Sequence, residues 1–135
     1  MPLLEWSILL STGIESIDEQ HKTLLGIVNE LNESLEHGGS PEKIKDIFNK
    51  LVLYTENHFK YEEELFEQYH YPLSEKHTEE HKALAKEIYF LKKKLDEDDL
   101  MINVELMAYL KDWLADHILN SDMAYSDHLL NHGAQ

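Results

Sequence analysis

Four segments of this sequence carry apolar residues at alternating steps of three and four positions, which places those residues on one face of an α-helix. The mean step of about 3.5 residues is typical of helices that pack side by side in a bundle. Turn-forming residues are scarce, with 5 Gly and 3 Pro among 135 residues, so a turn-rich all-β fold is disfavoured. The sequence therefore predicts an all-α fold, an antiparallel up-down-up-down four-helix bundle.

The whole chain, 1–135, is expected to form one domain. Residues that cap or break helices mark the ends of its helices and leave an irregular N-terminal arm at 1–17. The candidate capping and helix-breaking residues are Asp18, Gly38, Ser40, Pro41, Ser74 and Asn103. The helices expected from them span residues 18–37, 41–70, 74–95 and 103–128. Short connections between consecutive helices make neighbours antiparallel.

The charge of the chain excludes several kinds of partner. The formal net charge is −15, and all 12 basic residues are lysines. We therefore expect no nucleic-acid binding, which needs a cationic face, and no attraction to an anionic membrane. Cys is absent, which excludes disulfides and thiolate metal sites. Neither a secretory signal nor a membrane span is recognisable, so a cytoplasmic location is expected.

Polar residues interrupt the apolar stripes at positions where a core residue is expected. These residues are His21, His58, Glu62, His77, His81 and His117. A buried imidazole or carboxylate costs free energy unless it has a partner. In an antiparallel bundle the start of the first and third helices lies level with the end of the second and fourth. The sequence therefore predicts that these side chains, with Asp122, gather near one end of the core.

The spacing of these residues indicates a metal site. His58 and Glu62 are four residues apart, as are two of the other histidines, so each pair shares a helix face. His117 and Asp122 are five apart, about 140° on a regular helix. Either they reach the site from opposite flanks, or the helix is locally widened. Five imidazoles and two carboxylates suit borderline divalent metals and exceed the needs of one tetrahedral zinc. They are about enough for two irons if both carboxylates bridge.

The chain resembles the hemerythrin family, specifically its single-domain bacterial members, and the resemblance covers essentially the whole sequence. The motifs that carry it are Gly13-Ile14-x-x-Ile17-Asp18-x-Gln20-His21-Lys22, His58-Phe59-x-x-Glu62, His77-x-x-x-His81 and Trp113-Leu114-x-x-His117-Ile118-x-x-x-Asp122. Any one pair of these residues is a weak signal, whereas the combined pattern is highly specific.

The resemblance implies a non-haem centre of two Fe ions, Fe2+ or Fe3+, joined by an oxo or hydroxo bridge. It implies that the first iron is held by His77, His81 and His117, the second by His21 and His58, and both by the bridging Glu62 and Asp122. Six positions are then filled on the first iron and five on the second. Dioxygen is expected end-on at the open position, reduced to a bound hydroperoxide and released reversibly.

Apolar residues within one turn of the ligand positions are expected to line the dioxygen pocket, by analogy with the family, although all of them also suit a plain core role. They are Leu24, Phe59, Trp113, Leu114 and Ile118. An apolar wall would exclude water and proton donors. Tyr125 is expected to be a packing residue, and the pair His128 and His132 is expected to lie at the surface instead of forming a second metal site.

The leading interpretation is a dioxygen-binding protein for storage, delivery or sensing, not an enzyme. Delivery or signalling would involve a protein partner that the sequence does not identify. Two alternatives stay open at this point. One is a di-iron oxidoreductase of the peroxidase or nitric oxide reductase type, which would need proton delivery and a substrate channel. The other is an iron-handling protein, for which a labile site would be expected.

Overall fold

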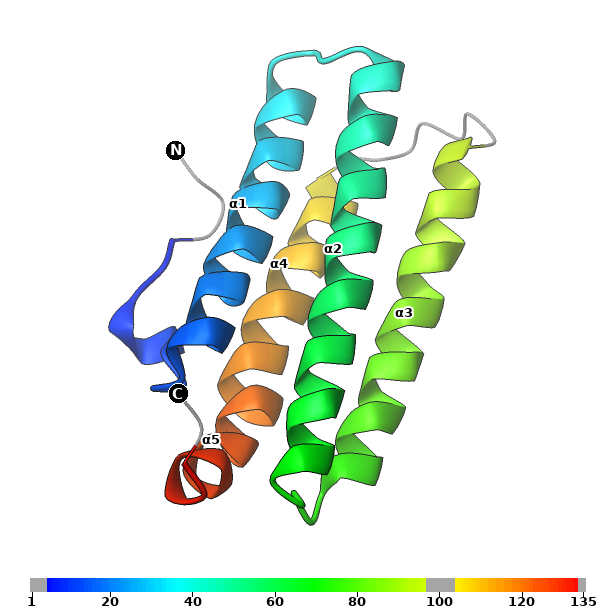
Figure 1. Ribbon diagram of the computed structural model, residues 1–135. Helices are drawn as coiled ribbons and strands as arrows, with labels where there is room; N and C mark the ends of the chain where they lie inside the picture. Colours follow the sequence, from blue (N-terminus) through cyan, green and yellow to red (C-terminus); the bar gives the residue numbers. More distant parts are fainter. Residues whose placement is uncertain (1–4, 97–103, 134–135) are drawn as a thin grey trace.

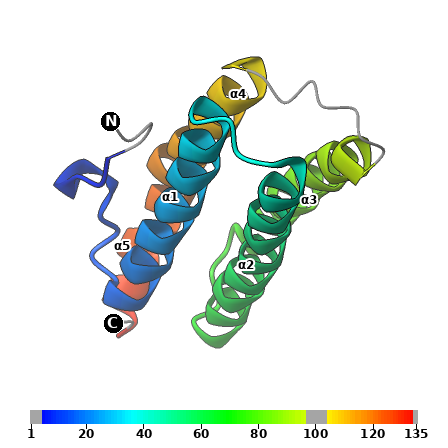
Figure 2. The ribbon, with the colours of Figure 1, turned by 90° about the horizontal axis from the view of Figure 1, so that it is seen from above.

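The computed structural model describes residues 5–96 and 104–133. Four helical rods run side by side, and consecutive rods point in opposite directions (Figure 1). The first three are α1 (Glu15–Glu36), α2 (Pro41–Gln68) and α3 (Ser74–Asp96); the fourth is continuous through α4 (Val104–Asp116), the π-helical segment η2 (His117–Asp122) and α5 (Met123–Asn131). This arrangement, seen from above in Figure 2, confirms the predicted antiparallel four-helix bundle. Within the described ranges no helix is long and apolar enough to cross a membrane.

The first helix begins at Glu15, three residues before the expected start, and Asp18 is not its N-cap. Ile14 holds the capping position with an extended backbone. The Asp18 carboxylate instead reaches back to the arm, where it accepts hydrogen bonds from the Thr12 backbone N–H (2.8 Å), the Thr12 hydroxyl (2.8 Å) and the Ser11 hydroxyl (2.6 Å). Asp18 therefore lies inside the first turn of the helix and binds donors of the preceding arm instead of capping the helix. The arm consequently ends before Glu15 and is shorter than the expected 1–17.

The turn between α1 and α2 has the predicted chemistry. Gly38 adopts a φ of 68°, the left-handed conformation that ends a helix at little cost for glycine. The Ser40 hydroxyl accepts a hydrogen bond from the Lys43 N–H at 3.1 Å, and Pro41 occupies the first helical position. Both expected capping residues of α2 are therefore confirmed.

The turn between α2 and α3 differs in detail from the expectation. α2 ends at Gln68, two residues short of 70, because His70 takes a left-handed φ of 54° and reverses the chain. Ser74 is the first residue of α3, and the Leu73 carbonyl accepts the His77 N–H at 3.0 Å from the capping position. The fourth rod extends to Asn131, beyond the expected 128. The expected cap Asn103 lies outside the described residues.

The apolar core is split into two clusters with the polar residues between them. The larger cluster includes Leu24 and Ile118, and the smaller one includes Ile17, Phe66 and Tyr125. On each of three helices a polar residue separates the two: His21 on α1, Glu62 on α2 and Asp122 at the end of η2. The polar layer is thus near one end of the bundle, as predicted, and an additional apolar layer closes it from that end.

Candidate metal centre

The structure brings together all seven side chains that the sequence singles out. They are His21, His58, Glu62, His77, His81, His117 and Asp122. All are buried, and even the most exposed, His117, is only 7% exposed. Their nitrogen and oxygen atoms form two groups, each within 4.8 Å, that share the two carboxylates. One group contains three histidines, His77, His81 and His117, and the other contains His21 and His58.

Asp122 stands between the two histidine groups. Its Oδ2 lies 2.9 Å from the Nε2 of His21. Its Oδ1 lies 3.2 Å from the Nε2 of His77 and 3.1 Å from the Nε2 of His117. Each oxygen of this carboxylate therefore faces a different group, which is the geometry of a residue able to bridge two cations.

Glu62 also contacts both groups, but through one oxygen. Its Oε1 lies 3.0 Å from the Nε2 of His58 and 3.3 Å from the Nε2 of His81. Its Oε2 accepts a hydrogen bond of 2.5 Å from the Tyr125 hydroxyl. The second carboxylate is therefore held in place by a phenol on its outer side while its inner oxygen faces the centre.

A local widening of the helix places His117 and Asp122 on the same side of the fourth rod. Residues His117–Asp122 are π-helical, and the Met123 N–H points to the carbonyl of Ile118, five residues earlier. In such a turn, residues five apart come close to the same face. Of the two possibilities left open by the sequence, the structure therefore supports the widened helix.

The inner polar atoms of this cluster lack hydrogen bonds. The atoms concerned are the Nε2 of all five histidines, Oε1 of Glu62 and both carboxylate oxygens of Asp122. Their mutual distances of 2.9 to 3.3 Å are short, yet none has hydrogen-bond geometry. An unsatisfied buried polar group costs about 1–3 kcal/mol, so a native core rarely holds so many together. Lone pairs of imidazole and carboxylate aimed at common points fit bound metal ions.

The charges of the metal-free cluster also favour bound cations. Burial and the Asp122 charge raise the pKa of Glu62, but contacts with His58 and His81 outweigh both and bring it down to about 2. Burial raises the pKa of Asp122 too, yet His117 holds it well below its usual range. Burial lowers the pKa of His58 and His117, but the carboxylates raise both values above that of free imidazole. The carboxylates thus attract cations, and protons compete with metal for the same nitrogens.

Tyr125 has a role that the sequence does not reveal. Its side chain is fully buried, and burial together with the charges of Glu62 and Asp122 raises its pKa well above 10. The phenol therefore stays protonated and remains a donor to Glu62. Tyr125 comes three residues after Asp122, and the only signal that could have found it is its place near that end of the helix.

Replacing Tyr125 by Phe is expected to destabilise the protein by about 1–3 kcal/mol, because a buried carboxylate oxygen loses its donor. Urea denaturation of the metal-loaded protein measures this change. Tyr109→Phe is the matched control, since Tyr109 is 38% exposed and its loss should stay within about 0.5 kcal/mol. Equal stability of the two variants would contradict the importance of the Tyr125–Glu62 contact.

The predicted apolar wall lies in the larger core cluster, which adjoins the polar layer. All of its members are buried: Leu24, Phe59, Trp113, Leu114 and Ile118. The Phe59 ring stacks on His81, with ring centroids 3.8 Å apart and planes 6° apart, and lies 5.9 Å from the ring of His117. Phe59 thus packs directly on the three-histidine group. The role of the wall as a dioxygen pocket stays a prediction.

The remaining histidine pair is structural. The Nε2–H of His128 is positioned to donate to the Tyr69 carbonyl at 2.7 Å, which ties α5 to the end of α2. The Nδ1 of His132 lies 2.7 Å from the His128 carbonyl, and the two rings stack at 4.2 Å. Among the residues that the structure describes, neither histidine belongs to a group able to hold a metal.

A helical bundle with a buried layer of histidines and carboxylates is typical of metal-binding helical proteins. Comparison with known sequences and structures identifies the family within this class. A sequence model of the hemerythrin HHE cation binding domain matches residues 12–129. The bacteriohemerythrin of Stenotrophomonas maltophilia is 34% identical over 134 residues, covering 98% of this chain and 85% of its own. That of Methylococcus capsulatus is 30% identical over 126 residues, covering 93% and 95%.

Solved structures agree with the sequence relatives. A wild-type hemerythrin superposes with a TM-score of 0.88 at 29% identity, covering 94% of this chain and 98% of its own. A hemerythrin with a leucine-to-alanine substitution gives 0.89 at 28% identity, covering 96% and 98%. The chain belongs to the hemerythrin family of oxygen-binding non-haem di-iron proteins.

Proposed function

We propose that the polar layer binds two irons with an oxo or hydroxo bridge and that the chain uses them to bind dioxygen reversibly. The observation that carries this proposal is the division of ligand atoms into two groups that share Glu62 and Asp122. One cation would take the group with three histidines, and is called the three-histidine iron below. The other would take the group of His21 and His58, and is called the two-histidine iron.

The two groups differ in how many positions the protein fills. The three-histidine iron would receive three imidazoles, two carboxylates and the solvent-derived bridge. The two-histidine iron would receive one imidazole fewer, which leaves a position for an external ligand. When bound, the irons supply the electrons for reversible dioxygen binding. Asp122, with one oxygen toward each group, would fix the separation of the two metals.

The protein side chains around the centre favour a carrier over a catalyst. The centre is buried between two apolar clusters, and Phe66 and Tyr125 pack edge-on against His77 at 4.8 and 5.5 Å. Apart from the Tyr125 hydroxyl, whose proton is held in the hydrogen bond to Glu62, these clusters keep water and proton donors away from the centre, which favours release of dioxygen unchanged. Seven buried ligands also favour retention of iron over its donation. We propose storage, delivery or sensing in the cytoplasm as the role.

Opening the wall is expected to shorten the life of the oxygenated protein. Leu114 is 1% exposed and lies three residues before His117. Leu114→Ala should leave a cavity beside the centre, and Leu114→Ser should add a proton donor. Both variants should bind the same amount of iron as the wild type, because no ligand changes. Both should convert to the ferric form faster, the Ser variant fastest.

Stopped-flow spectra after mixing the diferrous protein with dioxygen measure this conversion. Leu51→Ala is the control, because Leu51 is equally buried in the larger cluster but is not next to a ligand in the sequence. Unchanged decay in both Leu114 variants would show that the wall does not protect the centre. A wild type that becomes ferric within seconds, and faster with an added reducing substrate, would favour the enzyme alternative.

A further inference from the structure

The outward nitrogens of two ligand histidines have acceptors of different charge. The Nδ1 of His58 lies 2.6 Å from the amide oxygen Oε1 of Gln20 on α1. The Nδ1 of His81 lies 3.4 Å from the carboxylate oxygen Oε2 of Glu63 on α2. An acceptor at Nδ1 keeps the proton on that nitrogen, so the lone pair of Nε2 stays available for a metal. Both partners therefore favour the tautomer that the centre needs.

The charged and the neutral acceptor serve histidines of different metal groups. His58 belongs to the two-histidine group and is held by a neutral amide, whereas His81 belongs to the three-histidine group and is held by a carboxylate. An imidazole whose Nδ1–H is bound by a carboxylate donates its Nε2 electron pair to a metal more strongly than one bound by a neutral amide. A stronger donor stabilises the more highly charged state of a metal.

We propose that Glu63 is a positioning residue that, through His81, biases the three-histidine iron toward the ferric state, whereas Gln20 orients His58 without adding charge beside the two-histidine iron. This inference rests on the proposed function, because it requires iron in both groups. Glu63 and Gln20, which are not ligands themselves, would thus make the ferric state more favourable at the three-histidine iron than at the two-histidine iron.

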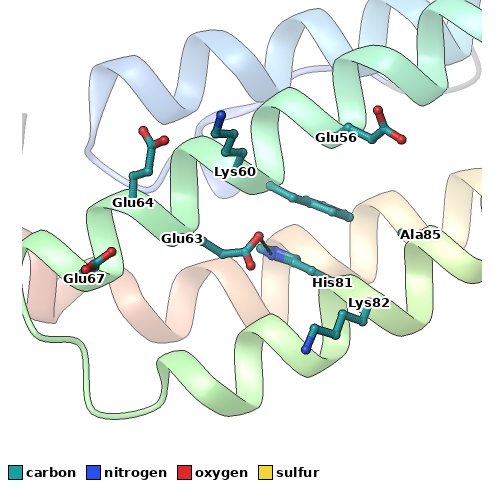
Figure 3. Close-up of a pocket in the computed structure, with 9 residues that line it drawn as sticks. Glu56, Lys60, Glu63, Glu64, Glu67, His81, Lys82 and Ala85 are labelled. Carbon is teal, nitrogen blue, oxygen red and sulfur yellow. Dashed lines mark hydrogen bonds and ion pairs between the residues drawn. The ribbon is translucent and has the colours of Figure 1, made fainter.

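The surroundings of Glu63 leave its charge directed at His81. Figure 3 shows Glu63 pointing toward the His81 ring in a hollow between α2 and α3, while Glu64 on the same helix points away from it. The ammonium group of Lys82, which also lines the hollow, pairs instead with Glu79 at 3.4 Å. The Glu63 side chain is 35% exposed, so water screens it and its effect should be moderate.

The test uses the iron-loaded full chain and the substitution Glu63→Gln, which keeps an oxygen acceptor for His81 but removes the charge. Glu64→Gln is the matched control, because it removes the same charge from the same hollow without touching His81. Reductive titration should show the ferric-to-ferrous equilibrium of Glu63→Gln displaced toward ferrous by about tenfold, or about 59 mV for a one-electron couple. A purely structural role would leave the Gln variant like the wild type.

A reciprocal variant and a metal-free readout make the test complete. Gln20→Glu places a carboxylate beside His58 and should displace the equilibrium toward ferric. In the metal-free protein, Glu63→Gln should shift the 15N resonance of His81 Nδ1, and Glu64→Gln should not. Equal potentials for Glu63→Gln and Glu64→Gln, in proteins that hold two irons and bind dioxygen, overturn this inference alone. Failure to hold two irons, or to bind dioxygen, would overturn the proposed function.

Discussion

Removal of the metals should lower the melting temperature by roughly 10 °C or more. A metal that binds only the folded state adds about 4 kcal/mol of stability when its free concentration is a thousand times the dissociation constant. For a domain of this size that corresponds to roughly 3 °C per kcal/mol. Without metal, the inner nitrogens and oxygens of the polar layer also stay buried without hydrogen bonds. Both effects act in the same direction.

Differential scanning calorimetry of the protein before and after chelation measures this difference. The control is the same chelator treatment of Asp122→Asn, which is expected to hold less metal than the wild type and should therefore change its melting temperature less when chelator is added. Circular dichroism tells a metal-free bundle from an unfolded chain. Equal melting temperatures of the metal-loaded and metal-free wild type would contradict a buried metal centre in this core.

The substitution Asp122→Asn should reduce the iron content from two per chain to less than one. Asp122 is fully buried and presents Oδ2 to His21 and Oδ1 to His77 and His117. Asn keeps the shape but removes the charge and one of the two acceptor oxygens. Because this one residue serves both groups, both sites should weaken together. His77→Ala, by comparison, removes a ligand from one group and should spare part of the iron.

Elemental analysis of protein purified from iron-replete cells measures the metal content of each variant. Asp127→Asn is the matched control, since Asp127 is exposed on α5 and lies outside both ligand groups. It should retain two irons. If Asp122→Asn also retained two irons, the bridging role of Asp122 would be wrong. Zinc at full occupancy in the wild type would contradict the di-iron proposal itself.

The bundle and the seven clustered residues could be predicted because they depend on periodicity. Helical spacing and antiparallel order bring His21, Glu62 and Asp122 to one level of the core, whatever the details of the turns. The start of α1 could not be predicted in the same way. Asp18 is an ordinary capping residue by type, but its contacts with Ser11 and Thr12 depend on how the arm folds back.

The surroundings of the centre depend on tertiary contacts that spacing does not encode. Tyr125 meets Glu62 across 63 positions of sequence, and Gln20 meets His58 across 38. Tyrosine and glutamine are common at helix positions of every kind, so residue type alone does not point to these contacts, although Gln20 belongs to a motif that carries the family resemblance. The π-helical turn was one of two possibilities, because the five-residue step from His117 to Asp122 shows a misfit but not how the backbone absorbs it.

Reversible dioxygen binding is tested most directly by an optical titration of the protein reconstituted anaerobically with Fe(II). We expect a visible absorption band to develop when dioxygen is admitted, to saturate at one dioxygen per two irons, and to disappear when dioxygen is removed under vacuum. The cycle should repeat with little loss. A protein that turns irreversibly ferric on first contact with air, or that shows no band while holding two irons, would contradict reversible dioxygen binding.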